Sequence, residues 1–195
     1  MVHYSDNHLH TAANEERGNQ YRTCVTEKSA VQQKQITESL LLLMQSKPFS
    51  EITVTQLCQH ANISRRTFYY LFSNLTGALY ALVDRKILEV SICSENEIAE
   101  FFTYWKAQKA LLEILEKNGM SGLLLERMIL RVLQEDHDVH QWLQRHGWKD
   151  HRRDLIVFGF TGLMGLVFSW HCSGYDRKPE EMAAVVKNLF APYWT

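Results

Sequence analysis

The sequence has few of the residues that interrupt or cross-link a fold. Three prolines and nine scattered glycines in 195 residues exclude a collagen-like or broadly disordered chain. The four cysteines are far apart and form no CxxC pair, which argues against a zinc knuckle and a disulfide-stapled scaffold. We interpret them as reduced thiols packed as small apolar groups, with a redox-sensing thiol as the alternative. These cysteines are Cys24, Cys58, Cys93 and Cys172.

A membrane-spanning segment and a secretory start are also missing. The most apolar run, Leu155 to Trp170, has 16 residues. As a helix it would cover about 24 Å of a hydrocarbon layer about 30 Å thick. The N-terminus has no basic start followed by an apolar run. We therefore expect a cytoplasmic protein with no membrane partner.

Enzyme signatures are absent as well: the sequence has no nucleophile elbow, no phosphate-binding glycine loop and no HExxH motif. We expect neither catalysis nor a cofactor. One dense group of metal-ligand residue types does occur, between two expected helices, where solvated residues normally collect. We interpret it as a solvated connection and expect no metal, with a metal-responsive regulator as the alternative. The group contains Asp136, His137, Asp138, His140, His146, Asp150 and His151.

Charge by itself gives little indication of a nucleic-acid partner. The formal net charge is −1, but its distribution is uneven. Counting Lys and Arg against Asp and Glu, residues 1–21 give 1 − 3 = −2, residues 22–75 give 6 − 3 = +3, and residues 76–195 give 14 − 16 = −2. The middle segment is therefore weakly basic for a DNA-binding region.

Helical periodicity is what the sequence does contain. Ile36, Leu40, Leu43 and Met44 follow the spacing of one buried helix face, and no comparable period of two occurs. With 46% apolar residues the chain can bury a substantial core. We predict an all-α fold whose first helix runs from about Ser29 to Ser46 and is ended by Pro48.

Three helix-start signals follow in close succession. Thr53 and Gln56 form a capping box before a short helix from Val54 to Ala61. Asn62 supplies a turn, because asparagine tolerates the left-handed backbone conformation.

The next two signals predict a second and a third helix. Ser64 can cap a helix from Arg65 to Phe72, and Asn74 can cap one that continues to about Val90. Phe68 and Phe72 share one face and should pack against Leu57 and Ile63. Arg65, Arg66, Thr67, Tyr69 and Tyr70 would then face outward, as base and phosphate contacts of a helix-turn-helix require. The alternative is an ordinary amphipathic surface helix with solvated arginines.

The segment ITVTQLCQHANISRRTFYYLF, Ile52 to Phe72, resembles the DNA-binding signature of the TetR family of repressors. The resemblance implies a homodimer on a palindromic DNA operator, released by an effector. It implies DNA-backbone contacts from Thr67 and Tyr69, with Arg65 and Arg66 nearest the bases. The expected DNA-binding residues are Thr53, Ser64, Arg65, Arg66, Thr67, Tyr69, Tyr70 and Asn74.

The sequence departs from the family pattern at three positions. Asn62 replaces a glycine, Leu71 stands where a His or Tyr phosphate contact is common, and Leu75 stands where a lysine is usual. The two leucines remove phosphate contacts, so Arg22 and Lys28 are candidates to compensate. They also motivate an alternative: an interaction protein that keeps the fold but has weakened or lost operator binding.

The C-terminal part is expected to be helical at about 95–117, 121–135, 152–173 and 179–190. The stretch GFTGLMGLVFSWHCSGYDRKPEEMA, Gly159 to Ala183, looks like the end of the family's C-terminal domain, which implies ligand binding and dimerisation. The predicted organisation is a mobile arm (1–28), a helix-turn-helix domain (29–75) and an effector-binding and dimerisation domain (76–195).

Two sets of residues belong to this C-terminal prediction. Aromatic and methionine residues at helical spacing form ordinary core or line a pocket for a small apolar effector. Glycines every third residue in the apolar run let another helix approach closely. The pocket candidates are Phe101, Tyr104, Trp105, Met128, Phe158 and Met164; the dimer-interface candidates are Gly159, Gly162, Leu163, Leu166, Trp170, Val186 and Phe190.

Overall fold

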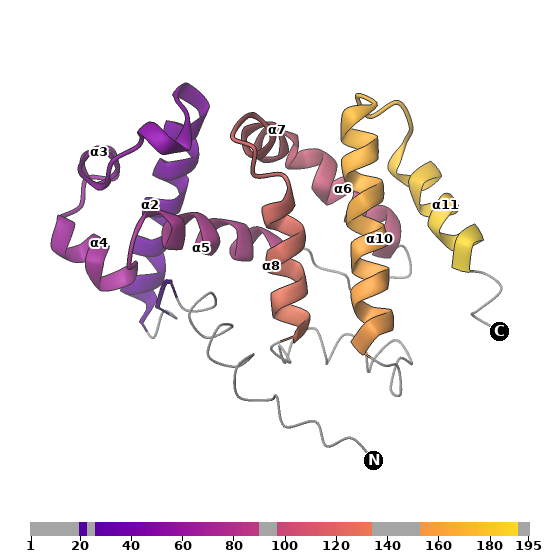
Figure 1. Ribbon diagram of the computed structural model, residues 1–195, viewed down its shortest axis with the longest axis horizontal. Coiled ribbons are helices and arrows are strands. Elements are labelled where there is room, and N and C mark those ends of the chain that lie inside the picture. Colours follow the sequence, from indigo (N-terminus) through magenta and orange to yellow (C-terminus); the bar gives the residue numbers. More distant parts are fainter. Residues whose placement is uncertain (1–19, 23–25, 90–96, 134–152, 191–195) are drawn as a thin grey trace, which may run out of the picture. The chain divides into compact units, whose positions relative to one another are not determined.

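A computed structural model describes residues 20–22, 26–89, 97–133 and 153–190 (Figure 1). All regular elements in these ranges are helices, so the predicted all-α class is confirmed. The chain divides into two compact units, residues 1–85 and 86–195. The division therefore falls later than the expected boundary between residues 75 and 76, inside the helix that follows the helix-turn-helix.

The first helix of the N-terminal unit, α2 (Glu27–Ser46), begins two residues before the expected start. Thr26 is its N-cap and forms a capping box with Ser29, which is the third helical residue and not the first. The helix ends at Ser46, and the C-cap residue Lys47 has an extended backbone. A short 3-10 turn, η1 (Phe49–Glu51), follows Pro48.

Three helices complete this unit: α3 (Val54–His60), α4 (Arg65–Leu71) and α5 (Leu75–Leu88). They agree with the expected helices to within two residues at each end. Helix α2 packs against both α3 and α4, which also pack against each other. The core residues that they bury are Ile36, Leu40, Leu57, Phe68, Leu71, Phe72, Leu79 and Leu82.

The expectation of a free arm over residues 1–28 is wrong for residues 20–22 and 26–28. Residues 26–28 belong to the cap and first turn of α2. Tyr21 forms an antiparallel bridge with Phe72, at the end of α4. Its hydroxyl donates a hydrogen bond to the carboxylate of Asp84 on α5. These contacts join segments far apart in sequence, so a count of local apolar residues could not detect them.

The C-terminal unit begins with α6 (Glu97–Ala107) and α7 (Lys109–Lys117), where a single helix over 95–117 was expected. The break is at Gln108, whose backbone N–H donates to both Tyr104 O and Trp105 O. Its carbonyl accepts from the amides of Leu111 and Leu112 and starts the next helix. The sequence has no Pro or Gly here. The bend lets both apolar stretches be buried: Phe101, Phe102 and Trp105 on α6, and Leu111, Leu112, Ile114 and Leu115 on α7.

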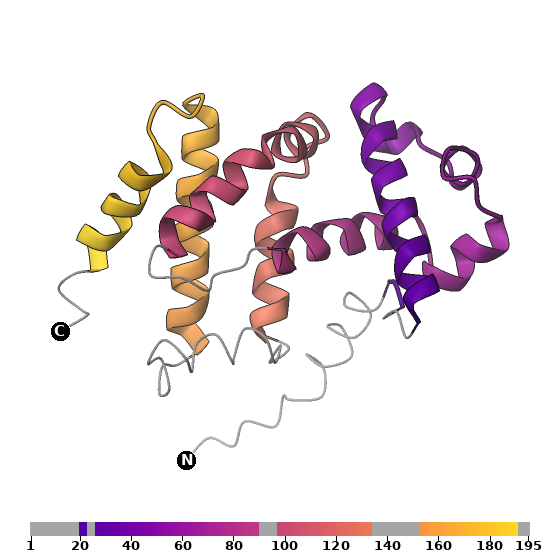
Figure 2. The same cartoon turned by 180° about the vertical axis from the view of Figure 1, so that it is seen from behind.

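The unit is completed by α8 (Gly122–Leu133), α10 (Arg153–Cys172) and α11 (Pro179–Phe190). Helix α10 packs beside α8, and α6 packs against α11 and α10 (Figure 2). As expected, α11 opens with Pro179 and two glutamates in its first turn. Within the described ranges no helix is long and apolar enough to cross a membrane.

The histidine-rich group at 136–151 lies outside the described residues. Among the residues that are described, no three His, Cys, Asp or Glu side chains gather as metal ligands would. Of the cysteines, Cys58 is buried and Cys172 is exposed, both as free thiols, whereas Cys24 and Cys93 lie outside the described ranges.

Candidate nucleic-acid interface

The predicted capping box fixes the start of α3. The backbone N–H of Gln56 donates to Thr53 Oγ1 at 3.2 Å, and the backbone N–H of Thr53 donates to Gln56 Oε1 at 3.0 Å. Lys47 Nζ donates to the same Gln56 Oε1 at 2.7 Å, a bond that the capping-box pattern does not predict. The cap therefore ties the end of α2 to the beginning of α3 as well as satisfying the first turn of α3.

The turn between α3 and α4 adopts the predicted left-handed conformation at Asn62, with φ of 49°. The amide of Ile63 donates to Cys58 O at 3.0 Å, which closes the end of α3. Gln35 on α2 donates from Nε2 to Ala61 O at 2.7 Å. A side chain of the first helix thus fixes the turn and the direction in which α4 leaves it.

Two further predicted caps are present. Ser64 Oγ accepts from the amide of Thr67 at 3.0 Å and lies 2.9 Å from Thr67 Oγ1. Asn74 Oδ1 accepts from the amide of Gly77 at 2.9 Å, at the start of α5. Thr53, Ser64 and Asn74 are exposed, and Thr67 is half-buried. These side chains position helix starts. Because the hydroxyls of Ser64 and Thr67 bond to each other, one of their two hydrogens is used in that bond and the other can be donated to a phosphate.

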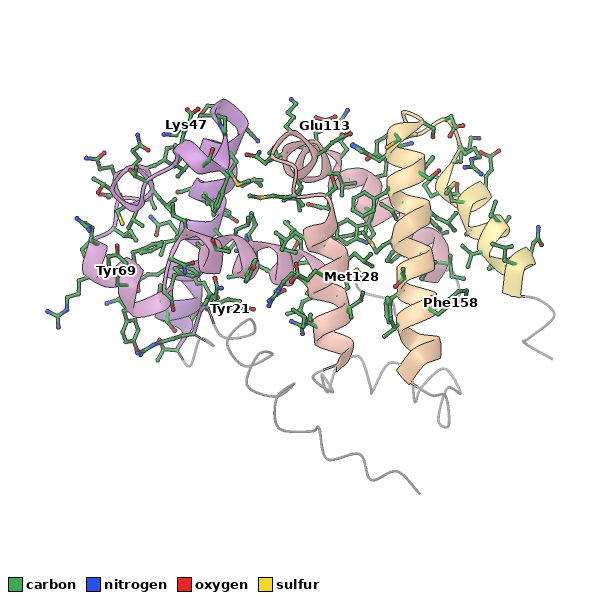
Figure 3. The ribbon with its side chains drawn as sticks, in the orientation of Figure 1. Tyr21, Lys47, Tyr69, Glu113, Met128 and Phe158 are labelled. Carbon is green, nitrogen blue, oxygen red and sulfur yellow. The ribbon has the colours of Figure 1, made fainter. Side chains whose placement is uncertain are left out.

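The orientation of α4 follows the prediction. Phe68 and Phe72 are buried with ring centroids 5.5 Å apart, and Leu57 beneath them is fully buried. Ile63 is half-buried. The outward face carries Arg65 and Arg66, both exposed, with Tyr69 and Tyr70 50% and 58% exposed. Figure 3 marks Tyr69 on this helix. The side chains suited to contact a duplex are therefore the ones in solvent.

Each exposed tyrosine lies beside an arginine. The guanidinium of Arg65 is 5.9 Å from the ring centroid of Tyr69, one turn along the same helix. The guanidinium of Arg22, from the segment before α2, lies 4.9 Å from the ring centroid of Tyr70. Both distances fall in the range of cation–π attraction. The second pair was not predicted, and no local pattern in the sequence indicates it.

The two leucines among the three departures from the TetR-like signature have different structural roles. Leu71 is only 1% exposed and belongs to the core beneath α4. Leu75 is half-buried at the first position of α5. Neither leucine can hydrogen-bond a phosphate through its side chain.

Cys58 lies on the inner side of the turn and lines a shallow hollow together with Asn62 and Arg65. Burial raises the pKa of its thiol, and the nearby Arg65 opposes that rise. The thiol is therefore protonated at neutral pH, as expected for a packed cysteine. The hollow belongs to the N-terminal unit and so is distinct from the effector pocket predicted over residues 101–164.

The pocket candidates in the C-terminal unit have unequal burial. Phe101, Trp105, Met128 and Met164 are buried. Tyr104 is half-buried, and its hydroxyl donates to Lys86 O at 2.6 Å. Phe158 is 66% exposed and does not line the interior of the unit (Figure 3).

The candidate residues for the dimer interface also differ in burial. Gly162 is exposed, and Gly159, Leu163 and Leu166 are half-buried. A Cβ built at either glycine would meet no atom within 4 Å, so the face of α10 at these glycines is open. Trp170 and Val186 are buried inside the unit, where they offer no surface to a second chain. The side chain of Phe190 lies outside the described part of the structure.

A capped helix, a left-handed asparagine turn and a second helix with outward arginines form a helix-turn-helix, the arrangement that many DNA-binding proteins use. The chain is 30% identical, over 91 residues, to the HTH-type dhaKLM operon transcriptional activator DhaS of Lactococcus lactis subsp. lactis (strain IL1403). That alignment covers 47% of this chain and 46% of the relative, so the chain spans about half the length of the curated relative that it matches. No protein-family model matches the chain.

Proposed function

We propose that this protein is a DNA-binding transcriptional regulator of the TetR type, without enzymatic activity. It binds a palindromic operator as a homodimer, with one α4 from each copy entering successive major grooves about 34 Å apart. The supporting observation is the orientation of α4: Phe68 and Phe72 are buried while Arg65 and Arg66 are exposed. The similarity to a named HTH-type transcriptional activator supports the same class.

The side chains on the outward face of the helix-turn-helix differ in the DNA groups that they can contact. Arg65 and Arg66 lie in the first turn, where a guanidinium can read O6 and N7 of guanine in the major groove. Tyr69 and the one hydroxyl hydrogen left free in the Ser64–Thr67 pair suit phosphate oxygens, which fix register but carry no base sequence. Specificity is therefore assigned to the arginines, and general affinity to the hydroxyl groups.

The test is a gel-shift series with the operator and an unrelated duplex. Replacing Arg66 with alanine should cost about 1–3 kcal/mol per half-site on the operator and little on unrelated DNA, because each copy of the protein loses a base contact. Tyr69→Phe removes one hydroxyl from the same face and should weaken binding to both duplexes alike. If both variants bind like the unmodified protein, α4 is not the recognition helix.

The C-terminal unit is proposed to carry dimerisation and effector binding. The open glycine face of α10 suits close approach of a second copy. Buried aromatic and methionine side chains around Trp105 and Met164 suit a small apolar effector. Its binding would favour a different spacing of the two α4 helices and release the DNA, which makes repression the proposed default.

A second candidate is an interaction protein with this fold and weakened or lost operator binding. The burial of Leu71 favours it, because a phosphate contact expected from the resemblance is replaced by core. A salt titration of binding to the protein's own upstream DNA separates the two. A specific complex that weakens with salt supports the regulator, and no specific complex at about 50 mM salt supports the interaction protein.

A further inference from the structure

Residues 20–22, named here the strap, run antiparallel to the end of the proposed recognition helix. The amide of Ser73 donates to Gln20 O at 3.0 Å, and the amide of Arg22 donates to Leu71 O at 2.9 Å. Between these two bonds Tyr21 pairs with Phe72. The strap is therefore attached by its backbone to the residues that end α4.

Side chains from two other helices hold the same three residues. Tyr21, marked in Figure 3, donates its hydroxyl hydrogen to Asp84, a carboxylate only 3% exposed on α5. Gln33 on α2 donates from Nε2 to Arg22 O at 3.1 Å. At Gly77 a Cβ would stand 2.2 Å from Gln20 O, so the close approach of the strap to α5 requires glycine there.

This anchoring places one exposed cation at the edge of the α4 surface. Arg22 is exposed, and its guanidinium stacks on Tyr70, which follows Arg66 by four residues and so shares its face. Arg66, Tyr70 and Arg22 form one row along the outward side of the helix-turn-helix. The cation–π contact restricts the guanidinium, and because Arg22 is exposed, its N–H groups can still donate to an anion.

We propose that Arg22 contacts a backbone phosphate of the bound duplex, and that the strap positions it. This rests on the proposed function, because it assumes that the α4 face meets DNA. Leu71 provides no side-chain contact there, but its carbonyl accepts the hydrogen bond that holds Arg22 in place. Arg22, which lies outside the recognition helix, thus supplies a positive charge near the end of α4, where the last turn of the helix has no basic residue.

Salt dependence of binding by the full-length protein tests the assignment. Each phosphate contact contributes about 0.9 to the slope of log K against log salt on duplex DNA. Because the proposed complex contains two copies of Arg22, Arg22→Gln should reduce that slope by about 1.8, twice the value for one contact, and weaken the operator and an unrelated duplex by the same factor. Arg22→Lys should retain most of the slope. Lys117→Gln, which removes an exposed charge from the C-terminal unit, is the matched control and should leave the slope unchanged.

The possible outcomes separate the two proposals. A specific complex whose slope is unaffected by Arg22→Gln overturns the role of Arg22 and leaves the regulator intact. A fall in slope that Lys117→Gln reproduces overturns it too, because the effect then reflects net charge alone. If the unmodified protein forms no specific complex, the proposed function fails first and the role of Arg22 fails with it.

A second variant tests positioning by the strap. Tyr21→Phe keeps the charge of Arg22 and removes the hydroxyl that bonds Asp84. Tyr21→Phe should weaken DNA binding by less than Arg22→Gln does. The double variant should bind DNA as well as Arg22→Gln alone, because both substitutions act through one contact. Additive losses would contradict the positioning role. Circular dichroism of each variant should show an unchanged helical content.

Discussion

At the scale of single residues, burial separates side chains that look alike in the sequence. The two tryptophans in the described residues, Trp105 and Trp170, are both fully inaccessible in the C-terminal unit. Trp170 Nε1 donates to Arg177 O at 3.2 Å. Trp105 Nε1 is buried without a hydrogen-bond partner among the described residues. The two indoles therefore contribute differently to stability although both were candidates for functional surfaces.

This difference predicts unequal effects of two matched substitutions. Trp170→Phe removes a hydrogen bond as well as packing volume, whereas Trp105→Phe removes a donor that has no described partner. Urea denaturation should show Trp170→Phe to be the more destabilising by about 1 kcal/mol. Equal losses, or a larger loss for Trp105→Phe, would indicate that Trp105 Nε1 is satisfied in solution.

At the scale of elements, short helices of the N-terminal unit depend on their ends. Helices α3 and α4 have seven residues each, too few to be stable in isolation. Their caps at Thr53 and Ser64 and the bond from Gln35 to Ala61 O hold them in a fixed arrangement. The orientation of the arginines on α4 therefore depends on polar side chains that, in the proposed complex, do not contact DNA bases.

The cap of α3 can be tested against a neighbouring threonine. Thr53→Ala should lower the free energy of unfolding by about 1 kcal/mol, because a backbone donor loses its partner. Thr55→Ala changes an exposed residue inside the same helix and should be neutral or slightly stabilising, since alanine has the higher helix propensity. Thermal unfolding of both variants measures the difference. A Thr53→Ala protein as stable as Thr55→Ala would show that the cap contributes nothing.

At the scale of the whole molecule, the proposed dimer depends on the exposed side of α10. Phe158 and Gly162 are four residues apart and both exposed, so they share a face. The glycine leaves room for a second helix to approach closely, and the exposed ring of Phe158 gives that face an apolar area to bury. The effector and the DNA are coupled in this proposal only if two copies associate, so oligomeric state is its first requirement.

Association can be disrupted on this face alone. Phe158→Glu should shift the protein from dimer to monomer in analytical ultracentrifugation, because a carboxylate would be buried without a partner in the interface. Leu42→Glu introduces the same charge at an exposed apolar position on α2 and should leave the dimer unchanged. If both variants sediment as dimers, the dimer interface lies elsewhere. If both sediment as monomers, a dimer that depends on this face alone is excluded.

Features that depend on neighbours a few residues apart could be predicted from the amino-acid sequence. The capping box at Thr53, the turn at Asn62 and the outward arginines of α4 all follow from side-chain chemistry within one or two helical turns. The all-α class follows from the same local periodicity.

Features that depend on partners far away in the sequence could be identified only in the folded chain. Tyr21 and Asp84 are separated by 63 positions, so no local pattern connects the strap to α5 or places Arg22 on Tyr70. The bend at Gln108 and the burial of Trp170 likewise depend on helices that pack against one another from other parts of the chain. Periodicity indicates that a face is apolar, but the packing partner decides whether that face is core or surface.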